Sequence, residues 1–204
     1  MNSKLIIIGA GGHGKVVAEI AELNNYKDII FLDDGEQTSV ASYPVVGKVK
    51  DAINYVNDRD FFVAIGNNSV RKRIVEELVG LGANIATLIH PNATVSKSAV
   101  IGVGTAVMAG AVINPCSEVK KGGIVNTCAS IDHDCTIEEY SHLAVGVHVA
   151  GTVKIGQNCF LGAGAIIKNN VNVCDDVTLG AGAVVVGDIT KKGTYIGVPA
   201  KLKD

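Results

Sequence analysis

Aliphatic residues recur at every sixth position along the second half of the chain. The series begins at Ile89, ends at Val185 and has seventeen members without an insertion. Four residues after each member comes a small or β-branched residue, as at Ala93, Thr105 and Ala111. This period predicts a parallel β-helix, in which each hexad forms one short strand and one turn. Stacked coils of this kind share an aliphatic core, and the spacing by itself leaves the handedness open.

The first part of the chain alternates short aliphatic runs with segments of helical spacing. Strands are expected at Leu5–Ile8, Ile29–Leu32, Phe61–Ile65 and Asn84–Leu88. Helical segments are expected over Val16–Leu23, at Val49–Val56 after a polar loop around Pro44, and after Ser69 as N-cap, with Gly80 and Gly82 closing the last. Strands alternating with helices predict a parallel sheet with right-handed crossovers. We therefore divide the chain into residues 1–88 and 89–204.

Overall charge and composition limit the kinds of molecule that the protein is expected to bind and the cellular compartment in which it is expected. The 18 basic and 20 acidic side chains give a net charge of −2, which argues against nucleic acid and anionic membrane as partners. Residues 98–117 carry no charge, but Gly102, Asn114 and Pro115 interrupt them, so we expect no membrane span. Leu5–Ile8 is too short for a signal peptide, which favours a cytoplasmic protein. The 5 cysteines form no CxxC pair, so reduced thiols are expected.

A glycine-rich loop, Gly9–Gly14, follows the first expected strand and precedes a helix. It fits the GxGxxG pattern that accepts phosphate, and Asp33 stands where a dinucleotide enzyme keeps its ribose-binding acid. An NAD site is one interpretation, and a turn that binds nothing is another. A Rossmann-like half domain of roughly 85 residues suits a mononucleotide better. The residues expected at one crevice are Gly11, Gly12, His13, Asp33, Asp34, Gly66 and Asn67.

Four motifs together carry a resemblance that extends over nearly the whole chain. They are the GxGGHG loop, the Leu-Asp-Asp strand end, the Ala64–Asn68 segment and the hexads. The chain resembles the hexapeptide-repeat sugar O- and N-acetyltransferases of the sialic acid and bacillosamine pathways. The resemblance implies a left-handed β-helix, a homotrimer and acetyl-CoA as co-substrate. It also implies an N-terminal domain that holds a UDP-linked 4-amino sugar.

His133 lies between two carboxylates in a hexad turn. A solvated turn is the simple interpretation, yet a carboxylate on one imidazole nitrogen raises the basicity of the other, as a general base requires. The segment Asn126–Cys135 resembles the catalytic segment of the family, which implies that His133 is the base and Asp134 its supporting acid. A zinc site of His133, His142 and His148 is a rival, but its spacing does not resemble that of three-histidine enzymes. A thiol nucleophile is disfavoured because Cys135 falls on an inward position.

The resemblance also implies a co-substrate site in the second half. His142 matches a family histidine that contacts acetyl-CoA from a neighbouring subunit. Turns with little side-chain bulk would admit the narrow pantetheine arm, and Gly197–Lys201 looks like the terminal loop beside the CoA nucleotide. The residues expected to bind acetyl-CoA are His142, Gly151, Gly162, Ala163, Gly180, Ala181 and Pro199.

The function predicted from these features is acetyl-CoA-dependent N-acetylation of a UDP-linked 4-amino-4,6-dideoxy sugar. Transfer is direct, with His133 as general base and no metal. One alternative is O-acetylation of sialic acid or a related sugar. An alternative of another class is a non-catalytic scaffold that binds a nucleotide sugar and only trimerises. Turnover of acetyl-CoA separates the scaffold from the two enzymes.

Overall fold

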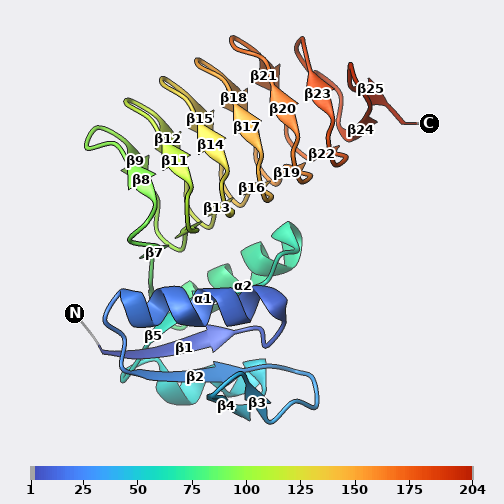
Figure 1. Cartoon of the computed structure of the whole chain (residues 1–204). Helices are drawn as coiled ribbons and strands as arrows, with labels where there is room; N and C mark the ends of the chain where they lie inside the picture. Colours follow the sequence, from blue (N-terminus) through green and yellow to red (C-terminus); the bar gives the residue numbers. More distant parts are fainter. Residues whose placement is uncertain (1–2, 204) are drawn as a thin grey trace. The chain divides into compact units, whose positions relative to one another are not determined.

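The computed structural model describes residues 3–203, which form two compact units (Figure 1). The first extends to His90 and the second begins at Pro91. No helix within residues 3–203 has the length and apolarity needed to cross a bilayer. None of the five cysteines forms a disulfide in this part of the chain.

The first unit is built on a six-stranded sheet with the strand order β3-β4-β2-β1-β5-β6. Its strands are β1 (Lys4–Ile8), β2 (Asp28–Leu32), β3 (Ser39–Val40), β4 (Tyr43–Gly47), β5 (Asp60–Val63) and β6 (Asn84–Ile85). The central strand β1 is parallel to β2 on one side and to β5 on the other. Its residues Leu5 to Ile8 are completely buried, as expected for a strand covered on both faces.

Three helical segments connect these strands: α1 (Gly12–Leu23), the 3-10 helix η1 (Val49–Tyr55) and α2 (Asn68–Gly80). The buried face of α1 includes Val17 and Ile20, whereas Val16 and Leu23 are exposed. The expected N-cap of α2 is wrong, because Asn67 and not Ser69 is the N-cap. The Asn67 side chain accepts a hydrogen bond from the Val70 N–H, which satisfies a free donor of the first turn.

Two further expectations in this unit are wrong. The segment around Pro44 is not a loop but the hairpin of β3 and β4. Strand β4 pairs with β2 from Val45 onward, so the missing N–H of Pro44 falls outside that ladder. The strand expected at residues 84–88 is split into β6 and β7 (Leu88–Ile89).

The second unit is a parallel β-helix whose short strands form three sheets. The first contains β10 (Ala106–Val107), β13 (Ile124–Val125), β16 (His142–Leu143), β19 (Phe160–Leu161), β22 (Val177–Leu179), β24 (Gly193–Ile196) and β25 (Lys201–Leu202). The second contains β8 (Thr94–Val95), β11 (Val112–Ile113), β14 (Ser130–Ile131), β17 (His148–Val149), β20 (Ile166–Ile167) and β23 (Val184–Val185). The third contains β9 (Val100–Ile101), β12 (Glu118–Val119), β15 (Thr136–Ile137), β18 (Lys154–Ile155) and β21 (Asn172–Val173).

From β8 to β23, neighbouring strands within each sheet lie eighteen residues apart, so three hexads complete one coil. Ile131, for example, pairs with Ile113 on one side and with Val149 on the other. The aliphatic member of every hexad from Val107 to Val185 is at most 3% exposed, which confirms the core that the period predicts. The stacked coils are visible in Figure 1.

The turns at the corners of the coils require a left-handed backbone. In one row this position is occupied by Gly110, Cys128, Gly146, Gly164 and Gly182. In the row between the second and third sheets, four non-glycine residues take it instead: Cys116, Asp134, Thr152 and Asn170. Asp and Asn tolerate this conformation better than most residues. This row therefore presents side chains where another corner presents mainly bare backbone.

Candidate functional site

His133 and Asp134 form a hydrogen-bonded pair in the turn between β14 and β15. The imidazole Nδ1 lies 2.8 Å from the Asp134 Oδ2. This hydrogen bond raises the pKa of His133, and the charge of Asp132 raises it further. With the Nδ1 proton held by Asp134, the Nε2 of a neutral imidazole is the atom that can accept a proton. The pair is solvent-accessible, as a group that must meet a substrate requires.

The turn that carries this pair is held on several sides. The Asp132 carboxylate accepts the His133 N–H at 2.8 Å and the Asn114 amide at 3.0 Å. The Asp134 N–H donates to the Pro115 carbonyl of the preceding coil at 3.1 Å. These bonds fix the backbone beneath the imidazole, and a fixed base is the arrangement that proton abstraction needs.

His142 lies in β16 of the same unit and is 7% exposed. Its Nε2 is 3.2 Å from the Asn126 Nδ2, while the Asn126 Oδ1 accepts the Thr127 N–H at 2.8 Å. That bond orients the Asn126 amide so that its nitrogen faces Nε2, where it can donate to a neutral imidazole. The ring of Phe160 meets His142 edge-on, with centroids 5.2 Å apart. No sequence motif predicts this pairing of two residues that are sixteen positions apart.

The other residues expected to bind acetyl-CoA also lie in the second unit. Gly151 is in the coil after His133, and its missing side chain faces the imidazole. A Cβ on Gly162 would lie 2.6 Å from the Leu179 carbonyl oxygen, so this glycine permits close approach of two coils. Gly180, Ala163 and Ala181 add almost no side-chain bulk. Pro199 is exposed and follows a cis peptide bond.

In the first unit, the expected substrate residues lie at the carboxyl ends of β1, β2 and β5. Gly11 is the N-cap of α1 and places no side chain over the helix N-terminus, and Gly12 begins the helix. His13 is in the first turn, where burial and the nearby positive charge of Arg71 lower its pKa to about 4. The imidazole is therefore neutral at physiological pH, and the helix N-terminus supplies the local positive potential.

The two aspartates after β2 bind different loops. The Asp33 carboxylate accepts the Ala10 N–H at 2.7 Å and the Gly35 N–H at 2.7 Å, which ties the end of β2 to the glycine loop. Asp34 accepts the Val49 N–H at 3.0 Å. In the loop after β5, the Gly66 carbonyl accepts a hydrogen bond from the buried Arg71 guanidinium at 3.2 Å, and Asn67 caps α2. Most polar atoms of these residues thus support the loops.

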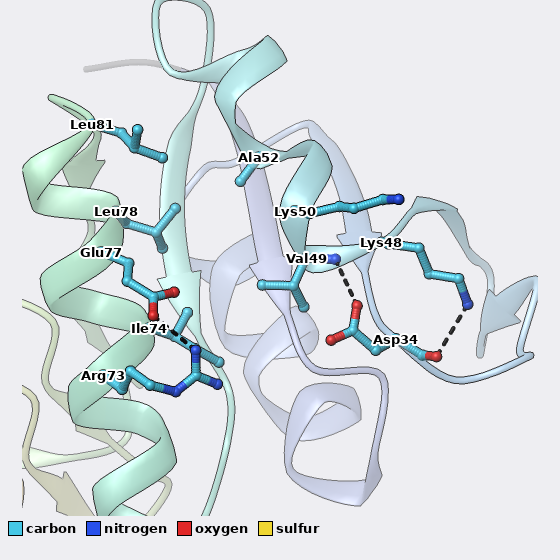
Figure 2. Close-up of a pocket in the computed structure, with 10 residues that line it drawn as sticks. All are labelled: Asp34, Lys48, Val49, Lys50, Ala52, Arg73, Ile74, Glu77, Leu78 and Leu81. Atoms are coloured by element: carbon cyan, nitrogen blue, oxygen red, sulfur yellow. Dashed lines mark hydrogen bonds and ion pairs between the residues drawn. The ribbon is translucent and has the colours of Figure 1, made fainter.

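A cavity of about 490 Å³ opens between η1 and α2 (Figure 2). Asp34 is the predicted site residue that lines it. Figure 2 shows Val49 and Ala52 on one side and the α2 side chains Ile74 and Leu78 on the other. Charged groups at its margin include Lys48, Lys50 and the ion pair of Arg73 with Glu77. The sequence did not predict this cavity, because its walls come from two segments far apart in the chain.

A smaller hollow of about 220 Å³ lies on the second sheet of the β-helix. Its polar lining includes Asn114, Ser130, Asp132 and His148, and the His148 Nδ1 is 2.8 Å from the Ser130 Oγ. His133, His142 and His148 thus contact three different partners. Among residues 3–203, no group of three or more His, Cys, Asp or Glu side chains is placed to hold a metal ion.

Comparison with known proteins gives a match for each unit. The PglD N-terminal domain matches residues 4–78, and the hexapeptide repeat of succinyl-transferase matches residues 152–186. The UDP-N-acetylbacillosamine N-acetyltransferase of Bacillus subtilis is 45% identical over 109 residues, which are 50% of this chain and 50% of that protein. The matched part therefore spans half the length of this curated relative.

Two solved structures match the whole chain. The acetyltransferase domain of PglB from Neisseria gonorrhoeae in complex with acetyl coenzyme A is 47% identical, with a TM-score of 0.96 and coverage of 100% of both chains. PerB from Caulobacter crescentus in complex with CoA and GDP-perosamine is 37% identical, with a TM-score of 0.94 and coverage of 98% and 97%. These matches confirm the predicted fold class, a Rossmann-like α/β half domain followed by a left-handed parallel β-helix.

Proposed function

The chain belongs to the family of hexapeptide-repeat N-acetyltransferases that act on nucleotide-linked amino sugars, and we propose that it acetylates a UDP-linked 4-amino-4,6-dideoxy sugar. Acetyl-CoA is the acetyl donor. The observation that carries the proposal is the His133–Asp134 pair, whose Nδ1 and Oδ2 atoms lie 2.8 Å apart and leave Nε2 available as a base. The B. subtilis relative favours a UDP sugar, and PerB makes a GDP sugar the competing substrate.

The first unit binds the nucleotide in this proposal. The diphosphate lies at Gly11, Gly12 and His13, where the N-terminus of α1 attracts anions. The base enters the cavity between η1 and α2, whose volume of about 490 Å³ is sufficient for a nucleoside. Asp34, which lines that cavity, is then one of the polar groups beside the base.

The second unit carries out the acetyl transfer. The sugar amine attacks the thioester carbonyl carbon, so that a C–N bond forms, and His133 Nε2 removes a proton from the nitrogen. The C–S bond then breaks, and CoA leaves as a thiolate that takes up a proton. Asp134 orients the imidazole and stabilises the imidazolium. Direct transfer of this kind requires no protein nucleophile.

Acetyl-CoA binds to the second unit at His142, along small residues of the turns and at the terminal loop. The set is His142, Gly151, Gly162, Ala163, Gly180, Ala181 and Pro199. Pro199 lies in the terminal loop, where the Ala200 N–H donates to the Val184 carbonyl at 2.8 Å. We also infer a homotrimer, in line with the family, and a cytoplasmic location, which suits a chain with free thiols.

The deciding experiment measures acetyl-CoA consumption with a panel of UDP-, GDP-, dTDP- and CMP-linked sugars, each as the amine and as the alcohol. Turnover of the UDP-linked amine alone supports the proposal. Turnover of a hydroxyl sugar supports O-acetylation, the runner-up. Binding of a nucleotide sugar with no turnover of any member supports the non-catalytic scaffold. A His133→Ala chain is the control for uncatalysed acetylation.

A further inference from the structure

The imidazole of His133 lies directly against the backbone of Gly151 in the next coil. A Cβ built on Gly151 would be 2.6 Å from Nε2 and 2.7 Å from Cε1 of the ring, closer than non-bonded atoms approach. Gly151 does not have the left-handed backbone that would itself require glycine. Its missing side chain therefore serves the neighbouring ring and not the chain conformation.

The backbone around this contact has little freedom to move apart. The Thr152 N–H donates to the His133 carbonyl at 2.9 Å, and the Asn170 N–H donates to the Gly151 carbonyl at 3.1 Å. These ladder bonds hold the three coils in register. An added methyl group at position 151 would be accommodated by rotation of the His133 side chain, because that is the flexible partner of the contact.

We propose that Gly151 is a positioning residue for the general base: its bare backbone is the surface that keeps the His133 ring in line with Asp134. This inference rests on the proposed function for its catalytic meaning, but the contact itself is geometric. It assigns Gly151 a role through His133 in addition to the acetyl-CoA contact inferred above.

A second glycine in the same β-helix shows what such a contact does away from the catalytic turn. The ring of Tyr140 covers Gly122, where a Cβ would clash with the Cδ1 and Cε1 atoms of the ring. Tyr140 is 1% exposed, so this contact fills space in the fold. His133 is 56% exposed in its side chain, so the packing against Gly151 orients a ring that solvent would otherwise leave mobile.

The first test measures the pKa of His133 in the full chain by NMR titration of its imidazole, without either substrate. Asp134 and Asp132 are the charged groups that raise this pKa. Gly151→Ala should lower it toward the value in Asp134→Asn, since the displaced ring loses the Asp134 bond. Gly187→Ala is the matched control, because a Cβ there meets nothing within 4 Å. An unchanged pKa in Gly151→Ala overturns the proposal.

Kinetics then separate positioning from acetyl-CoA binding. Displacement of a reacting group by about 1 Å lowers the rate roughly 10²-fold, so kcat of Gly151→Ala should fall by about that factor. The acid limb of its pH-rate profile should also move to lower pH. A higher KM for acetyl-CoA with unchanged kcat and pH profile would overturn the positioning role. A lower His133 pKa with unchanged kcat would instead overturn the base assignment in the proposed function and leave the contact intact.

A stability cycle covers the case in which the substitution disturbs folding. If the methyl group clashes with the ring, then Gly151→Ala should lower Tm in the wild-type chain and have no effect in a His133→Ala chain. An equal loss of Tm in both backgrounds would place the clash elsewhere and overturn the inference.

Discussion

The two units are stabilised in different ways, and they offer functional groups at different places. The first unit surrounds one central strand, β1, with helices and strands that each make their own set of contacts. The second repeats one contact every eighteen residues. Reactive side chains in the first unit gather at the carboxyl ends of strands. In the second they stand on turns that keep the repeat, as at His133 and Asp134. In this repetitive fold, the side chains on a regular turn and not a change of its backbone therefore distinguish the site.

The largest expected effect is that of His133→Ala on turnover. A positioned base contributes about 10² to 10⁴-fold, and kcat should fall by that factor. Nucleotide-sugar affinity should be nearly unchanged, because the proposed nucleotide site is in the other unit. Steady-state kinetics and calorimetry measure the two quantities. Near wild-type turnover in a correctly folded His133→Ala chain would contradict the mechanism.

Truncation of the repeating core tests how locally the second unit is stabilised. Ile137 is completely buried in β15 between Val119 and Ile155. Ile137→Ala should lower the free energy of unfolding by about 2 to 5 kcal/mol. Because each coil contacts only its neighbours, hydrogen exchange should rise in the adjacent coils and stay unchanged in β1 and β2. Equal acceleration throughout the chain would show that the two units unfold together.

His13 should make the first unit sensitive to acid. Its pKa is about 4 in the folded chain against an ordinary value of 6.5, so the unfolded chain binds the extra proton between these values. The free energy of unfolding should therefore fall by up to about 3 kcal/mol as pH drops from 6.5 to 4. Urea denaturation of wild-type and His13→Gln chains at several pH values measures this slope. His148→Gln, in the exposed part of β17, is the control, and an unchanged slope in His13→Gln would refute the assignment.

Asp134→Asn should have the smallest effect on turnover. The hydrogen bond from Asp134 raises the pKa of His133, so its replacement should lower that pKa. Since only the neutral imidazole accepts a proton, the acid limb of kcat/KM should move to lower pH. The plateau at higher pH should fall less than in His133→Ala, because the imidazole remains. A pH-rate profile measures both changes, and a limb that does not move would remove Asp134 from the mechanism.

The repetitive unit could be predicted from sequence more completely than the α/β unit. A six-residue period specifies strand, turn and inward position at once. The burial of the aliphatic hexad members from Val107 to Val185 could therefore be predicted from the period alone. The hairpin of β3 and β4 was missed because Pro44 suggested a loop, and tertiary pairing with β2 overrode that signal. Sequence does not distinguish Asn67 from Ser69 as the N-cap of α2, because asparagine and serine have similar N-cap propensities.

Some contacts of the candidate site could be predicted from the sequence and others could not. The order of residues 132–134 already places two carboxylates beside an imidazole. The partnership of Asn126 with His142 depends on the coil geometry, and the cavity between η1 and α2 depends on two walls that no local pattern connects. The Asn126–His142 contact and the cavity follow from the tertiary structure, and no sequence period predicts them.

Because of the eighteen-residue register, the β-helix can be lengthened or shortened only by whole coils if its side chains are to keep their faces. Removal of residues 152–169 would place Asn170 directly after Gly151, and every later side chain would keep its face. Gly180, Ala181 and Gly182 would then occupy the positions of Gly162, Ala163 and Gly164, which have the same sequence. Only the separation between His133 and the terminal loop would shorten, by one strand spacing of about 4.8 Å. The number of coils thus sets the distance that a molecule must span to contact both His133 and the terminal loop.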